Sequence, residues 1–160
     1  MKLIKFTVGC IAVTFANQPV SLAEVTRLAA EERQALQEVA RFHEVRRSTD
    51  LPPCILALCA DGKGRMAEPG QKWQVTDVIV HEALPGKRLI WAATDGKRYV
   101  VHYERGGIAH SFHVLIARLA QGDVRPKTVW CGVGEHFKDY PAFLTALKKG
   151  ALDDRLDYAQ

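Results

Sequence analysis

Residues 88–119, RLIWAATDGKRYVVHYERGGIAHSFHVLIARL, decide the fold. Apolar and polar residues alternate along much of this stretch, and a period of two indicates β-strands. Asp95-Gly96 and Gly106-Gly107 separate three such runs, and both dipeptides favour two-residue hairpin turns because glycine adopts positive φ at little cost. The stretch therefore predicts three consecutive antiparallel strands, at residues 88–94, 98–104 and 109–119.

The two turns also set the strand register. If each turn has two residues at its tip, Ile90 lies opposite Val101, and Val101 lies opposite Phe112. We expect that face of the sheet to form the core. The opposite face mixes apolar and polar side chains, so we expect it to be covered only in part. It carries Trp91, His102, Glu104, Ser111 and His113.

Residues 24–47 precede the sheet and have the spacing of a helix. Their apolar side chains recur at three- and four-residue intervals, with charged side chains largely opposite them. Pro52-Pro53 prevents the helix from returning, because each proline ring fixes φ and removes a backbone donor. We therefore expect one long amphipathic helix that ends near Ser48.

Shorter patterns complete the predicted fold. Strand-like runs occur at residues 55–59, 73–81 and 128–133. Asp139 is suited to cap a last helix, and Gly150 is suited to end it. The chain is therefore predicted to be α+β: a long N-terminal helix packed on a twisted antiparallel meander sheet of about five or six strands, followed by a short C-terminal helix.

The first 23 residues have the organisation of a signal peptide. Two lysines form a basic start, residues 6–16 are apolar and uncharged, and Ser21-Leu22-Ala23 offers small residues for cleavage. A membrane-spanning helix needs about 20 apolar residues, so this run is too short to remain inserted. We expect residues 1–23 to be removed and residues 24–160 to form a single domain that is periplasmic or secreted.

The mature chain is close to neutral in charge. The full sequence carries a formal charge of +4, and the leader contains two lysines and no acidic residue, which leaves +2. A nucleic-acid-binding protein normally has a strong basic stripe, and a membrane-surface protein has a basic amphipathic helix. Neither pattern occurs here. We therefore expect a protein or a small ligand as the partner, with no nucleic acid and no stable membrane insertion after leader removal.

Cys54, Cys59 and Cys131 remain once the leader is removed. In an oxidising compartment two of them are expected to pair. Cys54 and Cys59 are five residues apart on a predicted strand, which places them beyond disulfide reach. Cys131 is therefore the expected partner of one of them. We slightly favour Cys59–Cys131, and Cys54–Cys131 stays open.

The predicted register brings one candidate site together. His102 and His113 are diagonal neighbours on the partly covered face, and Ser111 lies across from His102. Glu104 and Trp91 share that face. Two imidazoles and a carboxylate suit zinc, whereas a histidine, a hydroxyl and an acid suit acid–base chemistry. The simpler interpretation, which we favour, is that these polar groups hydrogen-bond to each other. We take the five residues as a candidate ligand-binding surface and assign none of them as catalytic or metal-binding.

Motifs of common enzyme classes are absent from the sequence. It contains no G-x-S-x-G elbow, no phosphate-binding loop, no H-E-x-x-H pair and no dinucleotide fingerprint. We therefore predict no cofactor. The favoured hypothesis is an exported, non-enzymatic binding or accessory protein, of which an inhibitor is one kind. The alternative is a small metal-dependent or acid–base enzyme centred on the histidine, glutamate and serine cluster.

Overall fold

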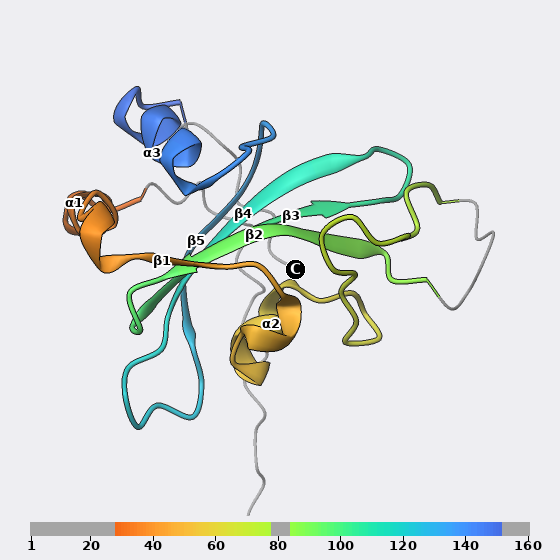
Figure 1. Ribbon diagram of the computed structural model, residues 1–160, viewed down its shortest axis with the longest axis horizontal. Helices are drawn as coiled ribbons and strands as arrows, with labels where there is room; N and C mark the ends of the chain where they lie inside the picture. Colours follow the sequence, from red (N-terminus) through yellow and green to blue (C-terminus); the bar gives the residue numbers. More distant parts are fainter. Residues whose placement is uncertain (1–27, 78–83, 152–160) are drawn as a thin grey trace, which may run out of the picture.

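The computed structural model describes residues 28–77 and 84–151, so the expected signal peptide lies outside it. One antiparallel sheet of five strands forms its centre, in the order β1-β2-β3-β4-β5 (Figure 1). Each strand therefore pairs with the next one along the sequence. The strands are β1 (His43–Val45), β2 (Lys87–Thr94), β3 (Arg98–Arg105), β4 (Ser111–Arg118) and β5 (Lys127–Gly134). The last four correspond to the strands predicted at residues 88–94, 98–104, 109–119 and 128–133.

Helices cover both faces of the sheet. Within the described residues, α1 (Ala30–Leu36) and α3 (Tyr140–Lys148) lie on one face, and α2 (Pro53–Cys59) lies on the other (Figure 1). We call these the α1/α3 face and the α2 face. Two 3₁₀ turns, Val39–Arg41 and Ser48–Asp50, lie between α1 and α2. The α+β class and the antiparallel meander are confirmed.

Both faces of the sheet are buried, which corrects the expectation that one of them is covered only in part. A side chain on either face is therefore removed from water, and its polar atoms need partners within the protein. The core of the α1/α3 face includes Trp91, Val100, Val114, Ile116 and Trp130. The core of the α2 face includes Ala92, Val101, Tyr103, Leu115 and Cys131.

The β2–β3 turn is displaced by one residue, and this leaves the faces unchanged. Gly96, with a φ of +85°, and Lys97 occupy its tip. Ala92, rather than Ile90, therefore lies opposite Val101. The pairing of β2 with β3 is thus shifted by two residues from the prediction. Side chains of a strand alternate between the faces with a period of two, so residues 91–94 remain on their predicted faces.

The β3–β4 connection is longer than the predicted two-residue turn, and this does change the faces. Residues 106–110 join the two strands. Leu115, rather than Phe112, lies opposite Val101. The predicted pairing is therefore wrong by three residues. An odd shift moves every side chain of β4 to the other face of the sheet.

Gly106 and Gly107 do not form a hairpin tip because they pack against another backbone segment. The Gly106 N–H donates to the Gly86 carbonyl, and the Gly107 N–H donates to the Val75 carbonyl at 3.1 Å. A Cβ atom on Gly106 would lie only 2.0 Å from the Gln74 carbonyl oxygen. These glycines therefore permit a close approach between two backbones.

The strand predicted at residues 73–81 is not observed in its described part. Thr76 forms a single isolated bridge with Gly107, and residues 73–77 otherwise lack strand pairing. Residues 78–81 lie outside the described ranges. Trp73 is buried, whereas Val75 is 42% exposed, so the alternating pattern of this segment does not correspond to one buried strand face.

Residues 55–59, predicted as a strand, belong to α2. Pro53 occupies the first turn of this helix, where the missing N–H costs nothing. Ile55 and Cys59 are four residues apart and are both fully buried against the α2 face. A short apolar run fits a buried strand and a buried helix equally well, so the sequence pattern alone does not distinguish them.

The predicted helix over residues 24–47 is wrong for its second half. α1 is only seven residues long, and residues 43–45 form β1 beside β2. Residues 24–27 lie outside the described ranges. The helical pattern treats Glu32 as solvent-exposed, but this carboxylate is buried and pairs with Arg98 at 3.0 Å and Arg118 at 2.7 Å. Pairing with the edge of β2 outweighs the helical spacing of residues 43–45.

The final helix agrees with its sequence signals. An Asp139 side-chain oxygen accepts the Ala142 N–H at 2.8 Å and so caps α3. Pro141 lies in the first turn, and Gly150 follows the helix with a φ of +69°. The predicted C-terminal helix is confirmed.

Replacing Gly106 with alanine tests the close approach of the two backbones. The new Cβ would lie 2.0 Å from the Gln74 oxygen and 2.7 Å from the Val75 oxygen, so the segments must separate. We expect Gly106→Ala to lower the free energy of unfolding in urea by more than about 2 kcal/mol. Gly62→Ala is the matched control, because nothing lies within 4 Å of its Cβ. It should change stability by less than about 0.5 kcal/mol. Equal losses of stability from the two substitutions would mean that the contact between Gly106 and the backbone of residues 74–75 does not determine the conformation of the β3–β4 connection.

Candidate functional site

The sheet divides the five predicted site residues between its two faces. Trp91, His102 and Glu104 lie on the α1/α3 face, and Trp91 pairs directly with His102. Ser111 and His113 lie on the α2 face. This separation follows from the longer β3–β4 connection. The predicted cluster of the His102 and His113 side chains is therefore wrong.

His102 is fully buried and holds three segments together. Its Nδ1 lies 2.8 Å from the His113 carbonyl oxygen, and its Nε2 lies 3.0 Å from the backbone nitrogen of Phe137. A carbonyl only accepts and a backbone N–H only donates, so Nδ1 carries the proton and Nε2 accepts. Burial lowers the pKa of His102 to about 4, which keeps the ring neutral. His102 therefore ties β3 to β4 and to the segment before α3.

Glu104 is also buried, and its charge is balanced within the protein. Its carboxylate pairs with Arg88 and with His110, whose Nε2 lies 2.8 Å from a Glu104 oxygen. The Trp73 ring packs against both partners, with centroid distances of 5.3 Å to the Arg88 guanidinium and 5.4 Å to the His110 ring. This group satisfies its own charges and hydrogen bonds and so has the properties of a structural cluster.

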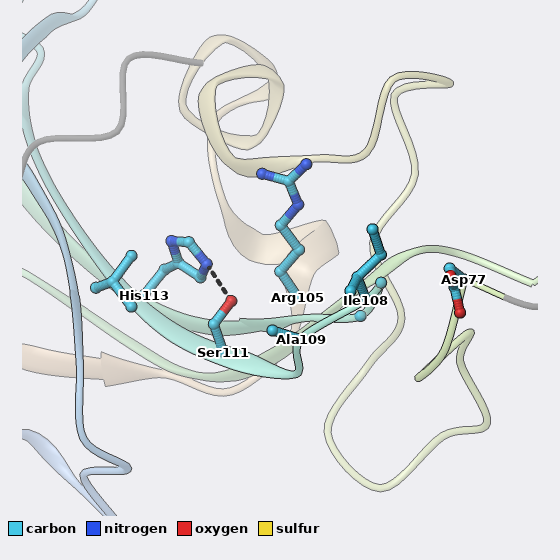
Figure 2. Close-up of a pocket in the computed structure, with 9 residues that line it drawn as sticks. Asp77, Arg105, Ile108, Ala109, Ser111 and His113 are labelled. Atoms are coloured by element: carbon cyan, nitrogen blue, oxygen red, sulfur yellow. Dashed lines mark hydrogen bonds between the residues drawn. The ribbon is translucent and has the colours of Figure 1, made fainter. Parts of the chain in front are cut away.

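A pocket of about 610 Å³ lies beside the β3–β4 connection (Figure 2). Ser111 and His113 line it, and Ser111 Oγ lies 2.9 Å from His113 Nε2. The Arg105 side chain, from the end of β3, stands beside this pair (Figure 2). Asp77 contributes a carboxylate from the segment that packs against Gly107. The apolar part of the wall comes from Ile108, Ala109 and Val133.

Two cationic side chains, Arg105 in the wall and Lys87 nearby, lie at the polar end of this pocket. Arg105 forms no ion pair with any residue that the structure describes. Burial, and then the positive charges of Lys87 and Arg105, lower the pKa of His113 to about 4. Burial also lowers the pKa of Lys87. His113 is therefore neutral at pH 7, with two cationic side chains close enough to affect its titration.

Ser111 and His113 have the atoms of a nucleophile and a base, but their surroundings do not suit catalysis. A general base works best when its pKa is near the operating pH, and that of His113 is about 4. The Tyr103 ring stacks on His113, with 5.1 Å between centroids and 11° between planes. No described carboxylate bonds to the His113 ring to orient it as a base. The pair is better suited to hydrogen bonding with a ligand.

The three thiols behave differently from the sequence prediction. Cys54, Cys59 and Cys131 form no disulfide within the part of the chain that the structure describes, so the expected bond is not observed. Cys59 and Cys131 nevertheless share the core of the α2 face. Burial raises the pKa of the Cys59 thiol to about 12, and Cys131 is close enough to add to the rise. The Cys59 thiol is therefore protonated at neutral pH and unreactive toward solvent in the folded protein.

Arg105, Ile108 and Asp77 line the pocket but are not among the site residues predicted from the sequence. Ile108 directly follows two glycines in the sequence and is 94% exposed in the structure. An apolar residue in a connection between strands is a sequence feature that could have indicated a binding surface. Arg105 precedes the same glycines. Asp77 gave no such signal, because it reaches the pocket only through the contact of its segment with the β3–β4 connection.

Comparison of the chain with models of known families, with curated proteins and with solved structures found no match. None of the described helices is long and apolar enough to cross a membrane. Residues 28–77 and 84–151 also contain no group of three or more histidine, cysteine or acidic side chains placed to hold a metal ion. The pocket beside the β3–β4 connection is therefore the feature that bears on function.

The two buried histidines predict a specific pH dependence of stability. His102 and His113 each have a pKa of 6.5 in the unfolded chain and of about 4 in the folded protein. Because burial disfavours the charged ring, the neutral rings leave the native state at its full stability above pH 6.5. As the pH falls from 6.5 toward 4, the unfolded chain takes up protons that the folded protein does not, and the free energy of unfolding decreases. Between pH 6.5 and 5 each histidine should lower the free energy of unfolding by up to roughly 1.4 kcal/mol per pH unit.

Urea denaturation at several pH values measures this slope. His113→Gln and His102→Gln should each reduce this slope. The slope is measured within each variant, so a loss of stability that is the same at every pH does not affect it. His113→Gln provides the measurement if His102→Gln does not fold. A slope that is the same in the wild type and in the folded variants would contradict the buried neutral state of these rings.

Proposed function

We propose that the protein is an exported, non-enzymatic binding protein that holds a small ligand in the pocket beside the β3–β4 connection. One observation carries this proposal: an Arg105 guanidinium without an ion-pair partner among the described residues and an exposed Ile108 line the same pocket. Ligand pockets typically combine an apolar wall with a few polar groups that fix orientation. Ser111 and His113 supply two such groups.

The rest of the predicted surface has a structural role instead. Trp91 is buried, and its Nε1 donates to the Phe137 carbonyl at 2.8 Å. His102 and Glu104 are buried with their partners already in place. A ligand could reach Trp91 or His102 only by displacing the segment before α3, and could reach Glu104 only by displacing its partners Arg88 and His110. Of the predicted ligand-binding residues, Ser111 and His113 therefore remain, and Arg105 joins them.

An acid–base enzyme is the competing function, and the geometry supports it less well. Within its predicted centre, the only two described side chains that hydrogen-bond to each other are those of Ser111 and His113, and His102 bonds instead to the His113 backbone carbonyl. The low pKa of His113 makes it a weak base at pH 7. The Gly106 and Gly107 N–H groups, which lie beside the pair, already bond to carbonyl oxygens and cannot serve as oxyanion donors.

Export and one disulfide are part of this proposal. Residues 1–23 have the charge and apolar pattern of a signal peptide. Cys59 and Cys131 share one buried core cluster, which supports them as the bonded pair in an oxidising compartment. Their burial means that the bond would form during folding, before the α2 face closes.

Intact mass measurement of the exported protein tests both parts of this statement. We expect the chain to begin at Glu24 and to contain one thiol that iodoacetamide modifies under denaturing, non-reducing conditions. Cys59→Ser should leave Cys131 open to modification, whereas Cys54→Ser should leave no reactive thiol. A chain that begins at Met1, or three reactive thiols in exported wild-type protein, would contradict export or the disulfide respectively.

Binding of small amphipathic probes tests the pocket. In amide NMR titrations, octan-1-ol, octanoate and octylamine serve as neutral, anionic and cationic probes. We expect at least one probe to shift the signals of Gly107, Ile108 and Ser111, with affinity lowered about three-fold or more by Ile108→Ser. Val124→Ser is the matched control, because Val124 is 87% exposed on the β4–β5 connection. If no probe shifts the pocket signals, the proposed function is wrong.

A further inference from the structure

We infer that the pocket binds a small organic anion: a carboxylate or sulfate monoanion attached to an apolar tail. This inference rests on the proposed function and specifies the chemical class of its ligand. It follows from the charges, the donors and the apolar surface that line the pocket. The two ends of such a ligand match two separate parts of the wall.

The charge of the pocket favours an anion. Arg105 lines it without an ion-pair partner in the described chain, and Lys87 is close enough to affect the titration of His113. Lys87 pairs directly with Arg105 across β2 and β3, so two cations stand side by side on the α2 face. Two adjacent like charges repel, and an anion bound between Arg105 and Ser111 would reduce this repulsion.

Asp77 is the acidic side chain in the described lining, and it does not neutralise this end of the pocket. Asp77 lies away from Arg105 and Ser111, beyond Ile108 (Figure 2). Like Arg105, it forms no ion pair with a described residue. The arrangement therefore favours a ligand whose single negative charge lies beside Arg105 and Ser111. A second negative charge farther along the ligand would approach the Asp77 carboxylate and is disfavoured.

Donor geometry supports the same ligand end. Arg105 provides a planar fork of N–H donors that matches the two oxygens of a carboxylate or sulfate. Neutral His113 can carry its proton on Nε2 and donate it to Ser111 Oγ, which lies 2.9 Å away. The Ser111 hydroxyl proton is then free to donate to the bound anion. Ser111 and Arg105 are paired residues on neighbouring strands, so their donors can converge on one group.

The apolar part of the wall accounts for the tail. Ile108, Ala109 and Val133 line the pocket next to these donors. Ile108 is 94% exposed, so a ligand tail that covers it removes apolar surface from water. An inorganic anion would leave this surface uncovered. The pocket volume of about 610 Å³ is within the range that holds a drug-sized molecule.

Titrations of octanoate, octan-1-ol, octylamine and inorganic phosphate, followed by amide NMR, test the inference. We expect octanoate to bind at Gly107, Ile108 and Ser111 at least about five-fold more tightly than octan-1-ol or phosphate, and octylamine to bind most weakly. Arg105→Gln should weaken octanoate binding about five-fold and change octan-1-ol binding less than two-fold. Raising the salt concentration should weaken octanoate binding selectively.

Arg125→Gln is the matched control, because this exposed arginine lies on the β4–β5 connection at the other end of the sheet. It removes the same charge and should leave octanoate affinity unchanged. Equal binding of octanoate and octan-1-ol, or equal effects of Arg105→Gln and Arg125→Gln, would overturn the anion inference while the pocket itself stands. Phosphate binding as tight as that of octanoate would overturn the requirement for a tail. Absence of binding by every probe would overturn the proposed function instead.

Discussion

The close approach of Gly106 and Gly107 to the backbone of residues 74–76 is the constraint on which the rest of the structure depends. It lengthens the β3–β4 connection to residues 106–110 and thereby decides which face of the sheet each β4 side chain occupies. It also brings Asp77 from a separate segment to the end of the sheet. Only a residue without a side chain fits at position 106, so this arrangement has a direct steric cause.

The burial of both faces separates structural polar groups from those that are available to a ligand. Glu32, Glu104 and His102 are buried, and each has its hydrogen-bonding or charged partners within the protein. Removing their charge or hydrogen bonds would leave unsatisfied atoms away from water. Arg105 differs from them, because it is exposed at the end of β3 and forms no ion pair with a residue that the structure describes. The polar groups that look most like an active site in the sequence are therefore those that hold the fold together.

Local sequence patterns predicted the parts of the fold that local forces determine. β2 to β5 follow from alternation, and α3 follows from Asp139 and Gly150 at its ends. Non-local contacts decided the rest. β1 forms because the edge of β2 is available for pairing, and α2 forms because the α2 face needs an apolar cover.

The candidate site was predictable only in part for the same reason. Ser111 and His113 were identified, but their assumed neighbours His102 and Glu104 lie across the sheet. Their actual neighbour in the pocket is Arg105. The register at β3–β4 depends on a segment some thirty residues earlier in the chain, and no pattern within β3 or β4 reports that contact.

The meander has a consequence for the order in which the chain can fold. Each strand pairs with its neighbour in sequence, so the sheet can grow strand by strand while the chain is still emerging from a ribosome or a membrane pore. α1 cannot be completed in this way. The Leu36 carbonyl accepts the Tyr140 hydroxyl at 2.6 Å, and the Leu147 carbonyl accepts an Arg33 N–H at 3.1 Å, across 104 and 114 residues of sequence. The docking of α1 therefore waits for the synthesis of α3, so the described helix that leaves the ribosome earliest is among the last to gain its native contacts.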